Sequence, residues 1–253
     1  MSNIKYLTQP EAVSMEDEWF EIANPEHFWV QWRYEFFKSF VGESELTNKH
    51  FFEIGCGHGL MINQIEAEFN SLVDGCDLNE YALNKIENNK GELFCYNIFQ
   101  QEKTFENRYD GLILFDVVEH ITDDLEFLCS SLFHVKSGGL VAVNVPAYQG
   151  LYSRYDTVLG HQRRYTKKML HDLFREAGLT DIQVGYWGFS MLPALVARKI
   201  LLTLRPRTDV AKNGFKPPSE GINSLFKRIM KAELKLLKKP FSGTSVMAIG
   251  RKP

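Results

Sequence analysis

The chain has 253 residues, 44% of them apolar, and a formal net charge of −3, which fits one large α/β domain with additions and a sizeable core. Its four cysteines show no paired C-x-x-C spacing, so we expect reduced thiols rather than a disulfide framework or a zinc site. The amino-terminal stretch has neither a basic start nor an apolar run, which argues against a signal peptide and favours a cytoplasmic protein.

The charge is unevenly distributed. Residues 198–239 contain twelve Lys or Arg and three Asp or Glu, a net +9, so the remainder of the chain carries −12. A basic segment on an acidic body predicts attraction to an anionic partner or surface. The alternative is a solvated helix face without a partner.

Residues 1–48 are expected to form an amino-terminal helical arm or cap. The first 24 residues are polar and acidic and predict a loose arm or a short helix. Asn24-Pro25 is a suitable helix start, because proline is favoured in a first turn. Aromatic residues then recur at spacings of three and four, as on the buried face of a helix; they are His27, Phe28, Trp29, Trp32, Tyr34, Phe36, Phe37 and Phe40.

Residues 49–188 alternate between strand and helix patterns, which predicts a parallel, doubly wound sheet. A glycine-containing turn at 136–139 is expected before the fifth strand. The predicted strands are 49–54, 72–77, 92–96, 109–115, 140–145 and 180–187, and the predicted helices are 59–69, 80–89, 123–134 and 166–178.

Residues 189–241 interrupt this alternation and are interpreted as a helical insertion. An apolar helix is expected at 189–204, but Pro193 and the adjacent Arg198-Lys199 make it too short and too charged to span a bilayer. A proline-rich loop at 205–221 leads to an amphipathic helix at 222–239 with lysines opposite its apolar face. The final strand is expected within 242–253.

The stretch F-F-E-I-G-C-G-H-G at 51–59 joins an apolar strand to a helix through three alternate glycines. Glycines let the backbone turn sharply and allow a ligand to approach it closely. This pattern resembles motif I of the class I S-adenosylmethionine (SAM) methyltransferases, whose loop cradles the methionine end of the cofactor. The resemblance assigns cofactor contacts to Glu53, Gly55, Cys56, Gly57 and Gly59.

Two further strand ends extend the resemblance. Asp77, followed by Leu78, ends the second strand, where an acid can accept both ribose hydroxyls; the alternative is an N-cap for the next helix. At the end of the third strand the family usually has an Asp followed by an apolar residue. Here Asn97 and Ile98 occupy these positions, and an amide oxygen can still accept a hydrogen bond from adenine.

The fourth strand ends in D-V-V-E-H-I-T-D at 116–123, which closely resembles the D-x-x-E-H-x-x-D stretch of SAM methyltransferases acting on small molecules and lipids, such as the ubiquinone-pathway O-methyltransferases. Asp116 is therefore assigned to the cofactor. His120 can accept a proton from an acceptor hydroxyl. The alternative role for His120 is to cap the loop or hold Glu119.

A third signature, D-x-x-x-G-H-x-R-R-Y-T at 156–166, resembles a subset of these enzymes. His161 is the second candidate base. Its neighbours are candidates for binding an anionic or polyhydroxylated acceptor, or for closing a salt-bridged loop over the cofactor. Such enzymes commonly use an amino-terminal helix to cover the site, which adds His27. The candidate acceptor-binding residues are His27, Tyr152, Arg163, Arg164 and Tyr165.

The resemblance implies a Rossmann-like class I fold with a seven-stranded, mostly parallel sheet, helices on both faces and a helical insertion before the last strand. It implies methyl transfer from SAM, leaving S-adenosylhomocysteine (SAH), to a hydroxyl or an amine of a small-molecule, sugar or lipid-linked acceptor, without a metal. Nucleic acid is not expected as a partner, because a [DN]-P-P-[YF] loop and a Pro-Cys nucleophile are both missing. Residues 189–241 are expected to form a partly mobile lid that recruits an acceptor with an anionic or lipid part at a membrane surface; the alternative is that these helices pack on the sheet or on the second subunit of a homodimer. A non-catalytic SAM-binding subunit is the alternative.

Overall fold

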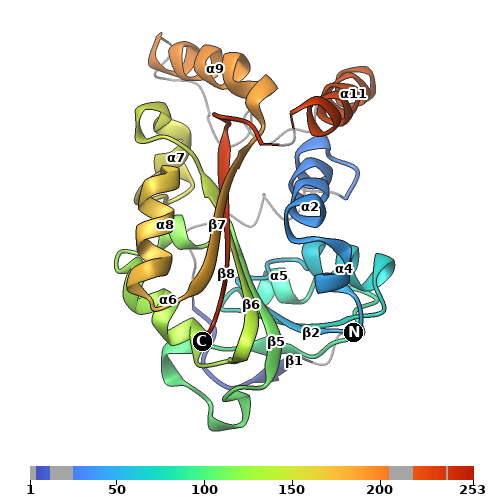
Figure 1. Ribbon diagram of the computed structural model, residues 1–253, viewed down its shortest axis with the longest axis vertical. Helices are drawn as coiled ribbons and strands as arrows, with labels where there is room; N and C mark the ends of the chain where they lie inside the picture. Colours follow the sequence, from blue (N-terminus) through green and yellow to red (C-terminus); the bar gives the residue numbers. More distant parts are fainter. Residues whose placement is uncertain (1–3, 12–24, 205–218, 238) are drawn as a thin grey trace.

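The computed structural model describes residues 4–11, 25–204, 219–237 and 239–253 and shows one eight-stranded sheet between helices (Figure 1). The strand order is β1-β4-β3-β2-β5-β6-β8-β7, and neighbours are parallel except that β8 is antiparallel to both β6 and β7. The strands are β1 (Ile4–Tyr6), β2 (His50–Ile54), β3 (Leu72–Asp77), β4 (Leu93–Cys95), β5 (Tyr109–Phe115), β6 (Val135–Pro146), β7 (Thr180–Trp187) and β8 (Ser245–Arg251).

The Rossmann-like architecture is confirmed, with one strand more than the seven expected. The additional strand is β1, which lies in the segment expected to be a loose arm or a short helix. It pairs in parallel with the edge strand β4, with Ile4 opposite Leu93 and Tyr6 opposite Cys95. This pairing satisfies backbone groups of β4 that would otherwise form an open edge. Most of the remaining expected arm lies outside the described residues.

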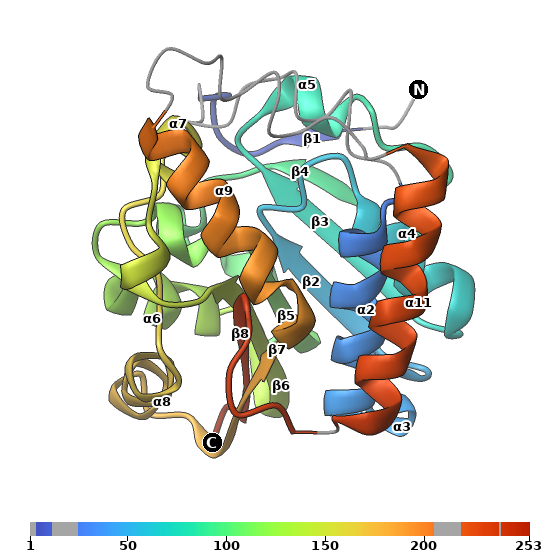
Figure 2. The same ribbon diagram turned by 90° about the horizontal axis from the view of Figure 1, so that it is seen from above.

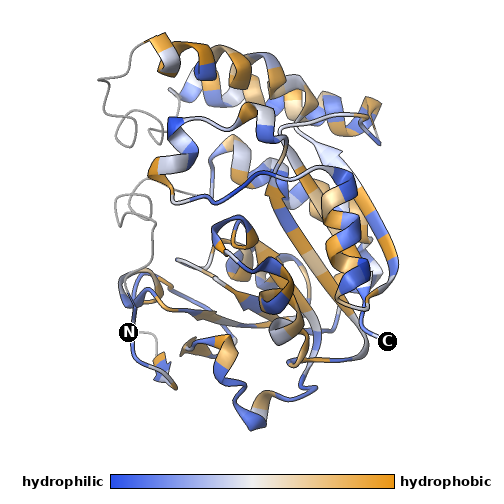
Figure 3. Cartoon of the chain, turned by 90° about the vertical axis from the view of Figure 1, so that its left-hand side faces the viewer, coloured by the Kyte–Doolittle hydropathy of each residue, from blue (hydrophilic) through white to orange (hydrophobic). Residues whose placement is uncertain are grey.

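Helices cover both faces of the sheet, as a doubly wound fold requires (Figure 1). Helices α2 and α4 pack on one face and α6 and α8 on the other, each with its own aromatic and aliphatic core. The central strands are mostly apolar, whereas the helices alternate apolar and polar bands (Figure 3). The helices are α2 (Phe28–Val41), α3 (Glu43–Leu46), α4 (Leu60–Glu68), α5 (Glu80–Leu83), α6 (Asp124–Leu132), α7 (Arg154–Val158), α8 (Lys167–Glu176), α9 (Leu192–Leu204) and α11 (Glu220–Leu236).

Three local boundaries differ from the sequence prediction. Helix α2 begins at Phe28 rather than near Pro25, because the His27 ring caps it by accepting the N–H of Trp29 at 3.2 Å. Helix α5 is a single turn, since the chain leaves helical geometry before Asn88, whose φ is +60°. The expected turn at 136–139 is part of β6, where the pairing with β5 shifts register.

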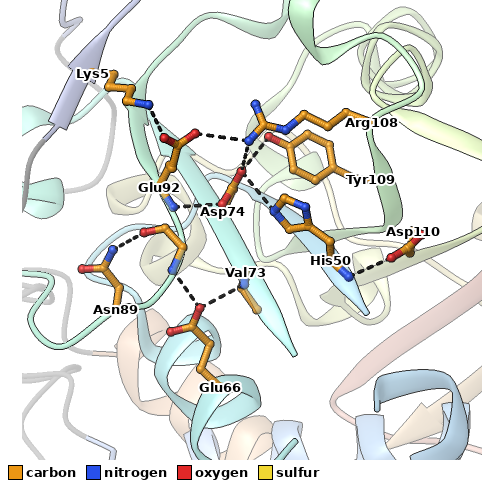
Figure 4. Close-up of polar contacts among 11 residues, drawn as sticks. Lys5, His50, Glu66, Val73, Asp74, Asn89, Glu92, Arg108, Tyr109 and Asp110 are labelled. Carbon is orange, nitrogen blue, oxygen red and sulfur yellow. Dashed lines mark hydrogen bonds and ion pairs between the residues drawn. The ribbon is translucent and has the colours of Figure 1, made fainter. Parts of the chain in front are cut away.

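A buried carboxylate joins four strands at the amino-terminal edge of the sheet (Figure 4). Asp74 of β3 has no exposed surface and accepts hydrogen bonds from the Tyr109 hydroxyl and Arg108 Nη2, both at 3.0 Å. His50 Nε2 lies 3.2 Å from the same oxygen, and the other oxygen accepts the backbone N–H of Glu92 at 2.9 Å. This network holds the sheet together on the edge opposite the glycine loop.

The helical insertion lies over the carboxyl ends of the strands, with α9 and α11 on either side of β2 and β5 (Figure 2). Helix α11 packs on α2, where the Phe226 and Phe28 rings are 4.7 Å apart. The buried Glu233 carboxylate accepts the N–H groups of Gly188 and Ser190 at 3.0 and 2.7 Å, which ties α11 to the start of the insertion. Residues 205–218 of the expected loop lie outside the described residues.

Candidate cofactor and acceptor site

A cavity of about 740 Å³ opens at the carboxyl ends of β2 to β5, below α2, α9 and α11. This volume falls within the ~300–1,000 Å³ range of small-molecule sites. It is lined by every cofactor-binding residue expected from the sequence except Gly59, and by His27, His120, His161 and Arg164. The loops that the sequence analysis singled out therefore converge on one cavity.

The glycine loop forms one wall of the cavity with left-handed backbone geometry. Gly55 has φ +71°, and a Cβ there would lie 2.5 Å from Val117 Cγ2. Gly57 has φ +53°, and its N–H donates to Asp77 Oδ2 at 2.8 Å. Gly59 begins α4 instead of lining the cavity. The loop can therefore present its bare backbone to a ligand only because these positions lack side chains.

Asp77 and Leu78 lie beside this loop. The second Asp77 oxygen accepts the N–H of Asn79 at 2.8 Å. Burial raises the pKa of Asp77, while these backbone N–H groups oppose the increase. Asn79 is the residue that caps α5, accepting the N–H of Ala82 at 3.1 Å. The alternative reading of Asp77 as that N-cap is therefore wrong, and the carboxylate faces the cavity.

Asn97 and Ile98 line the cavity at the end of β4. The Asn97 side-chain oxygen accepts the N–H of Phe99 at 3.1 Å, and its amide nitrogen donates to Glu11 at 3.4 Å. Glu11 also lines the cavity but was missed, because it lies in a polar segment with no recognisable pattern.

Acidic side chains converge at the centre of the cavity. Glu53 is 4% exposed, and burial raises the pKa of its carboxyl to about 8 despite the nearby Arg33 guanidinium. Among the described residues, Glu53 Oε2 has no hydrogen-bond partner. Asp116 is paired with Arg33 of α2, and its other oxygen accepts from Asn144 at 2.7 Å. Arg33 was missed by sequence reasoning, since it lies within an aromatic helix that reads as core.

The two candidate histidines meet at the side of the cavity. Their rings are edge to face, with centroids 4.8 Å apart. His161 Nδ1 lies 3.1 Å from the buried Asp156 carboxylate. Burial, together with His161, lowers the pKa of His120 to about 4, so His120 is neutral near pH 7.

Some residues of the loop at 152–166 line the cavity, and others make contacts outside it. Arg164 lines the cavity and donates to Asp156 at 2.6 Å. Arg163 instead forms a surface ion pair with Asp124 at 2.8 Å, and the buried Tyr165 hydroxyl donates to the same carboxylate at 2.7 Å. Tyr152 donates to the His161 carbonyl at 2.7 Å. These last three expected acceptor residues are not part of the cavity wall and hold the loop in place instead.

Helix α9 contributes a cavity residue that the sequence analysis did not assign. Arg198 lines the cavity, and its guanidinium carbon lies 4.1 Å from the centre of the Tyr155 ring. Burial lowers the pKa of Arg198. No carboxylate of the described residues lies within 4.0 Å of its charged group. The only sequence signal was a charge interrupting an apolar helix.

The model of a methyltransferase domain family matches residues 27–184, which is more than half of the chain and includes the loops at the ends of β2 to β6. The chain belongs to the class I SAM-dependent methyltransferases. No curated protein matches it. No helix of the described residues has the length and apolar character needed to cross a membrane.

Solved methyltransferases share the fold. A SAM-dependent methyltransferase from Archaeoglobus fulgidus has a TM-score of 0.58 at 17% identity, with 93% of this chain and 97% of that chain covered. The plantazolicin methyltransferase BpumL, solved with SAH, has a TM-score of 0.57 at 14% identity, with 94% and 88% covered. Phosphoethanolamine N-methyltransferase 2 from Haemonchus contortus, solved with SAM, has a TM-score of 0.54 at 18% identity, with 82% and 49% covered, so this chain spans about half of that protein.

The cavity of this methyltransferase fits SAM. The bare loop at Gly55 and Gly57 admits a ligand against the backbone, and Glu53 presents a carboxylate oxygen suited to an ammonium group. Asp77 and Asn97, whose side-chain oxygens can accept hydrogen bonds, line the same cavity. When bound, the cofactor supplies an electrophilic methyl group, so the protein itself mainly has to position the acceptor and exclude water.

Proposed function

We propose that the protein methylates a hydroxyl group of a small-molecule, sugar or lipid-linked acceptor that carries an anionic group. The observation that carries this proposal is the edge-to-face pair of His120 and His161 in the same cavity as the glycine loop. A SAM-binding subunit without catalysis would need the glycine loop but has no use for two histidines beside it.

His161 is the better oriented candidate base. Asp156 is fully buried and bonds the Nδ1 side of the ring, so the opposite nitrogen is available to an acceptor proton. A carboxylate that fixes a histidine tautomer in this way is a recurrent device in acid–base catalysis. His120 lies against His161 and is expected to help position the acceptor oxygen.

Arg198 supports an anionic acceptor. A guanidinium inside a cavity without a carboxylate partner among the described residues is suited to binding phosphate or carboxylate through paired hydrogen bonds. Two of the structurally similar enzymes are named for phosphoethanolamine and for plantazolicin. The anionic group that we propose on the acceptor of this chain rests on Arg198, and not on these names.

The outer surfaces of α9 and α11 favour contact with a membrane surface. Both helices expose apolar side chains, and α11 adds Arg228, Lys231 and Lys235. The inner face of α11 packs on α2 and therefore has a structural role. This packing leaves the outer face of α11 free for another contact. Apolar side chains mixed with cations are the composition of a helix lying at a lipid interface. The exposed large apolar residues are Val196, Ile200, Leu201, Leu204, Ile222, Leu225 and Leu236.

The test of the reaction is a screen of cell-extract fractions with labelled SAM, followed by kinetics on the acceptor found. His161→Ala should lower kcat by 10²–10⁴-fold, as loss of a general base typically does. Arg198→Met should raise KM with a smaller effect on kcat. His171→Ala is a matched control outside the cavity. If His161→Ala turns over at the wild-type rate, hydroxyl methylation with a histidine base is rejected.

A further inference from the structure

Glu119, His120 and His161 place three donor atoms beside one another at the acceptor side of the cavity. The ligand atoms lie within 4.8 Å of one another, although His161 follows His120 by 41 positions in the chain. Protein ligands bind first-row divalent cations at about 2.0–2.2 Å, so two donors of one ion lie up to about 4 Å apart. Small side-chain rotations would therefore bring all three onto one cation.

The Glu119 carboxylate is buried and has one oxygen that is not hydrogen-bonded within the described residues, as expected of a metal ligand. It lies in a short 3-10 helix, Val118–His120, directly after β5 and is 1% exposed. Its Oε2 has no hydrogen-bond partner within the described part of the chain. A buried carboxylate oxygen without a partner is costly, and a bound cation removes that cost.

The histidines are already oriented by a second layer of acceptors. Asp156 Oδ1 lies 3.1 Å from His161 Nδ1, and Asp156 is itself fixed by Arg164 Nε and by the backbone N–H of Ser153 at 2.6 and 2.8 Å. The His120 ring is hydrogen-bonded to the backbone of Gly160. Metal-binding histidines almost always donate their second nitrogen to a carboxylate or a carbonyl in this way.

Asp116 is excluded from this set by its partners. Arg33 occupies one of its oxygens and Asn144 the other, at 2.7 Å. The remaining donors are two imidazoles and one carboxylate, a set that suits iron, manganese or zinc better than the oxygen-preferring magnesium or calcium. Glu119, His120 and His161 all line the cavity, and three protein ligands would leave coordination positions open to another ligand there.

We propose that Glu119, His120 and His161 bind one divalent transition-metal ion, whose open positions take an oxygen atom of the acceptor. The use of that ion rests on the proposed function, whereas its binding does not. With an ion bound, the two histidines would serve as ligands in place of the histidine base proposed above, and the ion would lower the pKa of the acceptor hydroxyl so that its proton could pass to water. The sequence analysis expected no metal.

The test measures metal binding to chelator-stripped protein. Titration with Zn²⁺, Mn²⁺ and Co²⁺ by calorimetry should give about one ion per chain for at least one metal, and bound Co²⁺ should absorb in the visible. Glu119→Gln, His120→Ala and His161→Ala should each abolish this stoichiometric binding. Asp156→Asn should weaken it by about 10–100-fold, the usual effect of losing such a supporting contact. His171→Ala is the matched control, and SAH binding by every variant verifies folding.

The outcomes separate the two proposals. Stoichiometric binding of one of these metals that is lost in the three variants and kept in His171→Ala supports the site, whether or not a methyl acceptor is found. Failure of all three metals to bind a stripped protein that still binds SAH overturns the metal site. Methyl transfer that persists in excess chelator would then leave the histidine-base mechanism standing.

Discussion

Arg33 of α2 is paired with Asp116 at the end of β5, and this ion pair ties the amino-terminal helix to the rim of the cavity. Asn144 of β6 donates to the other Asp116 oxygen at 2.7 Å and accepts from Trp187 Nε1 at 2.8 Å. The chain of contacts joins α2, β5, β6 and β7. The helix that covers the cavity is therefore held by polar contacts as well as by its aromatic face.

Arg33→Met should weaken the attachment of helix α2 to the rim of the cavity. Loss of a partly buried, charged hydrogen bond is expected to lower the free energy of unfolding by about 1–3 kcal/mol. SAH affinity should fall as well, because Arg33 lines the cavity. Urea denaturation and calorimetry measure the two effects. Lys38→Met, which removes an ion pair between the same helix α2 and Glu68 of α4, is the control and should leave SAH affinity unchanged. Equal SAH affinity for the wild type and Arg33→Met would contradict the role of Arg33.

The glycine loop and Asp77 should control cofactor affinity. Gly55→Ala places a Cβ against Val117 at a positive φ, and Asp77→Ala removes the carboxylate beside the loop. Each should weaken SAH binding at least tenfold, about 1.4 kcal/mol, as measured by calorimetry. Gly138→Ala has a similar φ of +76° with nothing within 4 Å, so it reproduces the backbone strain away from the cavity. Wild-type affinity in Asp77→Ala would reject the cofactor assignment.

Asp74 should be needed for stability and not for cofactor binding. Burial by itself would raise the pKa of Asp74, but hydrogen bonds from His50, Glu92 and Tyr109 outweigh burial and hold the pKa below its ordinary value. A lowered carboxyl pKa stabilises the fold above the unfolded-state pKa, and this contribution is lost as the pH falls through the folded-state value. Asp74→Asn should therefore be less stable by about 1–3 kcal/mol at pH 7. SAH affinity at pH 7 should stay the same.

His134 should make the fold sensitive to mild acid. Burial lowers the pKa of this fully buried histidine to about 4, and its ring is hydrogen-bonded to the Tyr96 hydroxyl at 3.1 Å. Above about pH 6.5 the His134 side chain is neutral in both the folded and the unfolded protein. Between about pH 6.5 and pH 4 only the unfolded protein binds a proton at this histidine, so the free energy of unfolding falls with pH over this interval. The loss amounts to at most about 3 kcal/mol. His134→Gln should flatten the pH profile of urea denaturation over this interval, and the exposed His171→Gln should not.

Membrane contact is tested by sedimentation with vesicles. Anionic vesicles at low salt should bind the protein, and neutral vesicles should not, because each nearby Lys or Arg contributes roughly 1 kcal/mol at an anionic surface. Replacing Arg228, Lys231 and Lys235 by Ser should abolish binding. Lys227 is left intact, since it pairs with Glu26 and supports the packing of α11. The membrane proposal is rejected if the protein does not bind anionic vesicles at low salt. If the protein is then a dimer that dissociates when Leu225 is replaced by Ser, the exposed face of α9 and α11 is a subunit interface.

Local sequence patterns were sufficient to predict seven of the strands and the meeting of the four strand ends at one cavity. Apolar strands ending in Gly55, Asp77, Asn97 and Asp116 place these residues at one edge of a parallel sheet, because the carboxyl ends of parallel strands meet there. The positive φ of Gly55 follows from a turn that no other residue makes easily. Strand β1 escaped prediction, since three residues carry no periodicity and depend on an available edge of β4.

The acceptor side was decided by tertiary structure alone. Arg163 and Arg164 are adjacent in sequence, yet one lies at the surface and the other lines the cavity, because the chain turns between α7 and α8. Arg198 reaches the cavity only because α9 folds back over the strand ends. The meeting of Glu119 with His161 depends on the packing of two loops that no spacing rule connects. Contacts between distant segments are set by how helices pack on the sheet, and the linear pattern does not encode that packing locally.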